Sequence, residues 1–244
     1  MTDDKTRDRI YAQRQDRIDS FVFDQRVAAV FPDMISRSVP GYASIIGMIG
    51  ILAKKHAVRG SNLYDLGCSL GAVTVSMGRE VMQRDCRLVA VDNASAMLEK
   101  AEEQFARHDL PPVQTLCCDI RDVTVSNASV VVLNFTLQFL AVEERLTLLR
   151  NIRAGMLDDG VLILSEKISG ADEQEDELLI ELHHAFKRAN GYSDLEISQK
   201  RASLEEVLVP ETIAIHRARL AEAGFSRVDL WFQCFNFVSF VARP

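Results

Sequence analysis

The stretch Tyr64-Asp65-Leu66-Gly67-Cys68-Ser69-Leu70-Gly71 decides how this sequence folds. The short apolar run from Leu63 to Leu66 predicts a strand, and the pattern from Ala72 to Met82 predicts a helix. Small residues between them allow the backbone to turn tightly and to approach a ligand closely. The first turn of the following helix offers unpaired N–H groups and a partial positive charge. We therefore expect a strand-to-helix turn that forms part of a binding site.

The spacing of this turn differs from that of a dinucleotide site. Such a site has the pattern G-x-G-x-x-G, whereas Gly67, Ser69 and Gly71 occupy alternate positions here. Asp65 lies just before this turn, and its carboxylate would repel a pyrophosphate. A carboxylate suits a ligand with an ammonium group, such as the amino-acid end of S-adenosyl-L-methionine (SAM).

Strands and helices alternate through the rest of the chain. Further apolar runs and helical patterns follow at 88–91, 95–107, 113–118, 130–133, 143–154 and 161–165. Short buried strands separated by helices are typical of a parallel sheet with helices on both faces. Asp159-Gly160 predicts a turn before the fifth strand, and the aromatic-rich segments 225–232 and 235–241 predict a hairpin at the sheet edge. The expected fold class is α/β: a Rossmann-like class I methyltransferase fold, with a mostly parallel seven-stranded sheet and a C-terminal antiparallel hairpin.

Three regions lie outside this alternation. Helical patterns broken at Pro40-Gly41 predict an N-terminal helical cap before the first strand. Residues 166–223 predict a helical insertion, of a length that usually forms a lid or a partner surface. Residues 1–20 are polar and predict a flexible tail, or an arm that docks on another surface. Residues 21–244 are expected to form a single domain.

The ends of the strands carry the candidate binding residues, because ligands of open parallel sheets lie at the carboxyl ends of the strands. Asp92-Asn93 follows the second strand, and a carboxylate there can accept hydrogen bonds from a ribose diol. Asp119-Ile120 follows the third and could bind adenine through the carboxylate and the next N–H group. Asn134-Phe135 follows the fourth and would lie beside a sulfonium. Each aspartate alone could cap a helix, but the whole series favours an adenosyl ligand.

Composition limits the other classes of function. The net charge of −7 and the pI of about 5.3 disfavour a large nucleic-acid footprint. The sequence shows no signal-peptide pattern and no apolar run of membrane-spanning length. Its five cysteines form no C-x-x-C pair, and we expect all of them to be reduced, as in a cytoplasmic protein.

Other reactive side chains have simpler interpretations. His183-His184 faces two directions on a helix, with no ligand one turn away, so no metal site is expected. Cys68 lacks a partner histidine nearby in the sequence and is expected to pack as a small residue. Lys187-Arg188 and Lys200-Arg201 are expected to form solvated helix faces, with binding of an anion as the less favoured alternative. The aromatic residues after Leu230 are expected to form a core or a subunit interface.

Several strings outside the SAM-type turn resemble one family, the carboxy-S-adenosyl-L-methionine synthases. These enzymes serve the 5-oxyacetyl modification of uridine at the wobble position of tRNA. The resembling strings are 30–34 (VFPDM), 37–42 (RSVPGY), 64–71 (YDLGCSLG), 134–139 (NFTLQF), 186–193 (FKRANGYS), 197–201 (ISQKR) and 230–237 (LWFQCFNF). Together they cover the chain from about residue 21 to its end.

The resemblance implies a reaction and a set of site residues. The family converts SAM and prephenate into carboxy-SAM and phenylpyruvate. Arg201 matches the cation that pairs with the added carboxylate, which a guanidinium can grip through two hydrogen bonds. The family's cofactor contacts correspond to Tyr42, Asp65, Gly67, Cys68, Ser69, Asp92, Asn93, Asp119, Ile120, Asn134 and Arg201.

The resemblance also implies partners. The resemblance implies a homodimer. It also implies that a separate tRNA-modifying enzyme uses the product, so no direct contact with nucleic acid or membrane is expected. The leading alternative is an ordinary SAM-dependent methyltransferase that acts on a small molecule. A non-catalytic SAM-binding module and direct modification of tRNA are further alternatives.

Overall fold

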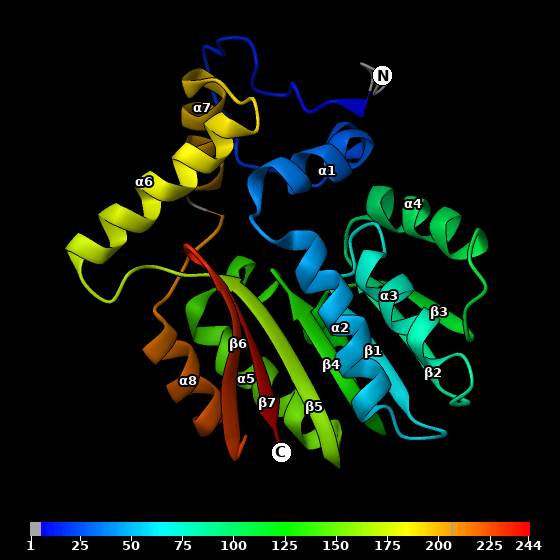
Figure 1. Ribbon diagram of the computed structural model, residues 1–244. Helices are drawn as coiled ribbons and strands as arrows, with labels where there is room; N and C mark the ends of the chain where they lie inside the picture. Colours follow the sequence, from blue (N-terminus) through cyan, green and yellow to red (C-terminus); the bar gives the residue numbers. More distant parts are fainter. Residues whose placement is uncertain (1–5, 206) are drawn as a thin grey trace.

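The computed structural model describes residues 6–205 and 207–244, and its centre is one seven-stranded sheet (Figure 1). The strand order is β3-β2-β1-β4-β5-β7-β6. The strands are β1 (Asn62–Leu66), β2 (Arg87–Asp92), β3 (Val113–Cys117), β4 (Ala128–Asn134), β5 (Met156–Lys167), β6 (Arg227–Cys234) and β7 (Phe237–Arg243). The first five strands run parallel, and β7 is antiparallel to both of its neighbours. The predicted sheet and its C-terminal hairpin are therefore confirmed.

Helices cover both faces of the sheet, because the central strands are apolar on both sides. In β4, Val130 and Val132 join the core under one set of helices, whereas Val131 and Leu133 join the core under the other. The first set is α2 (Tyr42–His56), α3 (Ala72–Val81) and α4 (Ser95–Ala106). The second set is α5 (Val142–Gly155) and α8 (Ile213–Glu222). Two short 3-10 helices, η2 (Ile120–Asp122) and η3 (Leu137–Phe139), follow β3 and β4.

Three further elements lie over the carboxyl ends of the strands: α1 (Gln25–Ser38), α6 (Glu173–Ala189) and α7 (Asp194–Leu204) (Figure 1). Asp24 caps α1 by accepting a hydrogen bond from the Val27 N–H, and Gly41, with φ 75°, makes the sharp change of direction into α2. Within the described residues no single helix is long and apolar enough to cross a membrane; by length and composition alone the pair α1–α2, bent by 97°, would pass.

Two sequence expectations need correction. The turn predicted at Asp159-Gly160 lies inside β5, where residues 157–160 are accommodated opposite Ser129 as an irregularity in the ladder. The insertion also does not form one unit. Its α6 and α7 stand over the strand ends, whereas α8 packs beside α5 and β6 as part of the regular helix layer.

The described part of the polar N-terminal segment is a docked arm, the second of the two expected states. It runs across the top of the molecule toward α7 (Figure 1). The Asp8 carboxylate is buried and accepts a hydrogen bond from the Tyr192 hydroxyl at 2.6 Å. Gln199 of α7 donates to the backbone carbonyls of Tyr11 and Gln13. The arm therefore fastens the α6–α7 pair to the rest of the chain.

Candidate ligand-binding site

The turn after β1 is tight and includes left-handed backbone conformations, as its small residues predict. Gly67 and Gly71 have φ of 83° and 80°, and Ser69 has φ of 50°, all in the left-handed region. A Cβ on Gly67 would lie 2.4 Å from the side chain of Thr136, so only glycine fits there. The N–H groups of Gly67 and Cys68 both donate to the Val91 carbonyl, which fixes the turn against β2.

Asp65 lies beneath this turn and does not line the cavity above it. Its Oδ2 accepts hydrogen bonds from the N–H and the hydroxyl of Thr74, at 3.0 and 2.6 Å. Its Oδ1 is buried and has no partner among the described residues. Burial raises the pKa of Asp65 to about 7. One carboxylate oxygen thus orders the start of α3, and the other is left available.

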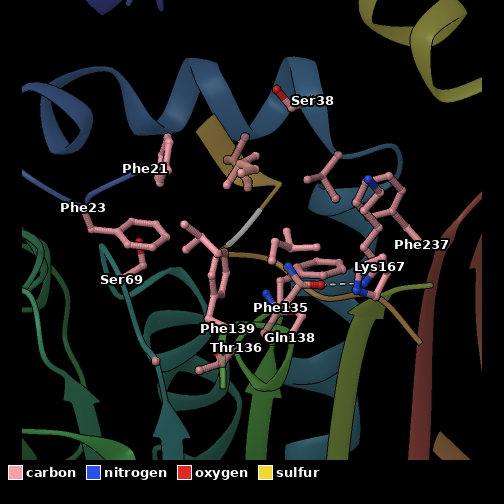
Figure 2. A pocket seen from close by; sticks show the side chains of 18 of the residues that line it. Phe21, Phe23, Ser38, Ser69, Phe135, Thr136, Gln138, Phe139, Lys167 and Phe237 are labelled. Carbon is pink, nitrogen blue, oxygen red and sulfur yellow. Dashed lines mark hydrogen bonds between the residues drawn. The ribbon is translucent and has the colours of Figure 1, made fainter. Parts of the chain in front are cut away.

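A cavity of about 710 Å³ opens above the strand ends, within the range of small-molecule sites. Figure 2 shows Ser69 and Phe23 toward one side of it, Lys167 and Phe237 toward the other, and Phe135 and Phe139 between. The predicted residues that line it are Tyr42, Gly67, Cys68, Ser69, Asp92, Asn93, Asp119, Ile120, Asn134 and Arg201. The fold therefore brings together every predicted residue except Asp65, although they come from distant parts of the chain.

The two aspartates after β2 and β3 have different surroundings. Asp92 accepts hydrogen bonds from the N–H groups of Ser69 and Ala94, and burial raises its pKa. The guanidinium of Arg121 donates to Asp119 Oδ1 at 2.9 Å and to Asp119 Oδ2 at 2.7 Å. These hydrogen bonds lower the pKa of Asp119. Arg121 also pairs with Glu144 of α5. Both aspartates cap local backbone, as the simpler interpretation expected, and both still face the cavity.

The end of β4 combines an orphaned polar atom with a strained aromatic residue. The Asn134 Oδ1 is buried and has no partner among the described residues. Phe135 follows with φ of 62°, a conformation that costs energy for a side chain of this size. Its ring lies 6.4 Å from that of Tyr42 and 5.9 Å from that of Phe237. This arrangement places aromatic faces and one free amide oxygen together at the centre of the cavity.

Two residues that looked reactive in the sequence are accounted for by packing. Cys68 is 5% exposed and packs against Ala90 and Leu98, and burial raises the pKa of its thiol. His183 contacts the Ser38 carbonyl through Nε2 at 2.8 Å, and burial holds its pKa far below the usual value. No group of three or more histidine, cysteine or acidic side chains arranged to hold a metal occurs in the described residues.

Cations gather at the other end of the cavity. Arg201 of α7 lines it and, within the part of the chain that is described, has no hydrogen bond or ion pair. Lys167 and Lys187 line it as well. Lys167 was not predicted as a site residue, and the solvated face expected at Lys187 and Lys200 is wrong, because both are buried. Lys167 stands at the carboxyl end of β5, so the strand-end rule could have found it.

The chain is similar to several known proteins. A family model described as "Methyltransferase domain" matches residues 63–160. Two solved structures share the fold: a Nostoc punctiforme protein described as an O-methyltransferase, and human N-acetylserotonin methyltransferase in complex with SAM. The first has a TM-score of 0.65 and 18% identity and covers 90% of this chain and 60% of its own. The second has a TM-score of 0.59 and 15% identity and covers 90% of this chain and 55% of its own.

Relatives with curated names are much more similar. Carboxy-S-adenosyl-L-methionine synthase of Geobacter sp. (strain M21) is 59% identical over 240 residues, which is 98% of each chain. The enzyme of the same name from Vibrio cholerae serotype O1 (strain O395) is 54% identical and covers 97% of this chain and 96% of its own. Identity of this level over almost the whole length confirms the resemblance found in the sequence. The chain therefore belongs to the carboxy-S-adenosyl-L-methionine synthase family.

Proposed function

We propose that this enzyme converts SAM and prephenate into carboxy-SAM, phenylpyruvate and water. The observation that carries the proposal is the position of Arg201. Its guanidinium opens on the same cavity as the SAM-type strand ends and has no anionic partner among the described residues. An ordinary methyltransferase has no use for a free cation in the cavity where its methyl group lies, whereas a carboxymethyl sulfonium carries a carboxylate for that cation to bind.

The predicted contacts give each part of SAM a partner. The unpartnered Asp65 Oδ1 would accept from the ammonium group, either directly or through water at the turn. Asp92 and Asn93 would bind the ribose, while Asp119 and Ile120 would bind adenine. The sulfonium would then lie near Asn134, Phe135 and Tyr42, where aromatic faces favour a cation.

The chemistry balances without an oxidant or a reductant. The donor loses its ring carboxyl group as CO₂ and its ring hydroxyl group, and its ring becomes aromatic. The methyl carbon of the sulfonium loses a proton and forms a bond to the carbon of CO₂, and that proton leaves with the hydroxyl group as water. The protein's task is to hold the two reactants in a dry, shaped cavity and to stabilise the charges.

The test is turnover with two labelled substrates. Purified protein is supplied with SAM and with prephenate that carries ¹³C in the ring carboxyl group. We expect carboxy-SAM that contains the label, together with an equal amount of phenylpyruvate. Arg201→Ala should lower carboxy-SAM affinity about tenfold or more, because a charge-assisted pair is lost, and should leave SAM affinity within about twofold. A wild-type protein that consumes no prephenate would contradict the proposal.

The remaining expectations concern the setting of the reaction. We propose that the enzyme works as a cytoplasmic homodimer and that a separate enzyme uses carboxy-SAM to modify the wobble uridine of tRNA. The net charge of −7 supports this division, because an acidic surface repels the tRNA backbone. Measured binding of tRNA at micromolar affinity that weakens with added salt would contradict it.

A further inference from the structure

The cation-lined end of the cavity holds more positive charge than the product's single new carboxylate requires. Besides Arg201 it contains Lys167 at the end of β5 and Lys187 near the end of α6. The three act on one another electrostatically, since Lys167 and Arg201 both lower the pKa of Lys187 and Arg201 lowers that of Lys167. Three cations from three different elements therefore converge on one part of the cavity, which we call the cationic lobe.

Lys187 is the least compensated of the three. Its side chain is 7% exposed, and it has no hydrogen bond or ion pair with any described residue. The charges that act on it are all positive, from Lys200, Lys167 and Arg201, and burial with these neighbours lowers its pKa to about 7. Lysines are almost never buried without a partner, because removing an ammonium from water is costly. The missing partner is an anion that the described residues do not supply.

Lys200, which also lines the cavity, and two further groups near the lobe already have partners. Lys200 donates to the Ser38 hydroxyl at 3.2 Å and lies 3.8 Å from the Asp8 carboxylate. His183 contacts the Ser38 carbonyl, and its lowered pKa keeps it neutral. Asp176 is the acid that acts on Lys167, but its Oδ1 already accepts from the Gly170 N–H. The uncompensated charge is therefore concentrated on Lys187 and Arg201, with Lys167 partly offset.

We propose that Lys187 and Lys167 bind the carboxylate that the donor keeps, the one found in phenylpyruvate after the reaction. This inference rests on the proposed function. The donor has two carboxylates, and a cation bound to the one that departs as CO₂ would stabilise the ground state and slow its loss. Binding the retained carboxylate carries no such penalty, because that group is unchanged in the transition state.

The aromatic residues beside the lobe fit the rest of the donor. Phe135 and Phe237 stand edge to face at 5.9 Å, and His183 lies 4.9 Å from Phe237. Figure 2 shows Phe237 beside Lys167 on the side of the cavity away from Ser69. A six-membered ring that packs on these faces would have its retained carboxylate at the lysines and its reacting carbon toward Asn134. Arg201 is then left for the carboxylate of the product.

The test compares Lys187→Met with Arg188→Met, a matched control on the same helix. Arg188 is exposed, pairs with Asp194, and does not line the cavity. In Lys187→Met we expect KM for prephenate and the inhibition constant of phenylpyruvate to rise about tenfold to a hundredfold. KM for SAM and the affinity for carboxy-SAM should stay within about twofold. The control should match wild type in all four measurements.

Folding and the proposed function are checked separately. Methionine keeps the length of the side chain and removes a buried unpaired charge, so the melting temperature of Lys187→Met should not fall below that of wild type. Lys167→Met is a second variant. We again expect KM for prephenate and the inhibition constant of phenylpyruvate to rise, while KM for SAM and the affinity for carboxy-SAM stay within about twofold. Wild-type protein that turns over prephenate, with both variants unchanged in KM and in phenylpyruvate inhibition, overturns the inference alone. A variant that loses affinity for carboxy-SAM but keeps its affinity for phenylpyruvate also overturns the inference alone. Wild-type protein without turnover overturns the proposed function itself.

Discussion

At the scale of single residues, the site is built from atoms that the fold leaves unsatisfied. The Asp65 Oδ1 and the Asn134 Oδ1 are both buried without a partner among the described residues. The Lys187 amine is buried among cations, and burial together with these neighbours lowers its pKa to about 7. Such groups destabilise a protein unless they find a partner, and a ligand bound in the cavity would supply one for these three.

The raised pKa of Asp65 predicts that SAM binding depends on pH. Below about pH 7 the folded protein keeps a proton on this buried carboxyl that an unfolded chain would lose above pH 4. The protonated Asp65 should therefore raise the free energy of unfolding of the ligand-free protein at low pH. This contribution should disappear as pH rises toward 7. An ammonium group needs the ionised carboxylate, so SAM affinity should change in the opposite direction.

Titration calorimetry of SAM binding between pH 5.5 and 7.5 checks this prediction. We expect SAM affinity to increase with pH by up to about tenfold per pH unit below 7. Asp65→Asn should bind more weakly and remove this dependence. An unchanged dependence in Asp65→Asn would exclude contact between this carboxylate and the ammonium.

Residue types at the strand ends were predictable from sequence, but their partners were not. The rule that ligands lie at the carboxyl ends of parallel strands identified Asp92, Asp119 and Asn134. The same rule applied to β5 would have found Lys167. The sequence gives no sign that Arg121 grips Asp119, because that contact depends on the path of the chain after β3. The role of Arg201 came only from the family resemblance.

At the scale of elements, a buried ion pair connects the helix layer to the segment that leads out of the lid. The side chain of Arg145 in α5 is fully buried and donates to Glu211, which precedes α8. The same guanidinium donates to the carbonyls of Leu140 and Val209. Glu211 also pairs with Arg219. This pair fixes the end of the chain segment that carries α6 and α7.

Breaking this pair should cost much stability. Glu211→Gln leaves the buried Arg145 charge without its counterion and should lower the free energy of unfolding by about 3–5 kcal/mol. The control is Glu222→Gln, which breaks the exposed pair with Arg150 and should cost about 1 kcal/mol or less. Urea denaturation of the two variants and wild type measures both values. Equal losses of unfolding free energy in the two variants would show that the buried Arg145 pair stabilises the protein no more than the exposed pair does.

The periodicity of the sequence predicted where the helices and strands lie along the chain, but it did not predict which of them pack together. Helical patterns predicted α6, α7 and α8 together as one insertion, but pattern alone cannot say that α8 joins α5 while α6 and α7 cover the strand ends. The turn predicted at Asp159-Gly160 exists as a local irregularity, and the sheet ladder continues past it because Met156 still pairs with Ala128. Tertiary pairing overrides local turn preference there.

At the scale of the whole molecule, the cavity has two ends with different tasks. The end at the β1 turn has the features of a SAM site, which are shared across the methyltransferase fold. The other end is lined by residues of α1, α6 and α7 together with Lys167 at the end of β5, and it includes the buried Lys187. The SAM-type end therefore belongs to the common fold, and the proposed carboxylation depends on the end that the added helices line.

The mass of the nucleoside bound after incubation with SAM and prephenate is the sharpest test of carboxy-SAM synthesis by this enzyme. The protein is freed of excess ligand, denatured, and its bound nucleoside is analysed by mass spectrometry. We expect a species heavier than SAM by one CO₂ unit from wild-type protein, and little of it from Arg201→Ala, which should still hold SAM. Wild-type protein that retains only SAM or its demethylated form would exclude carboxy-SAM synthesis.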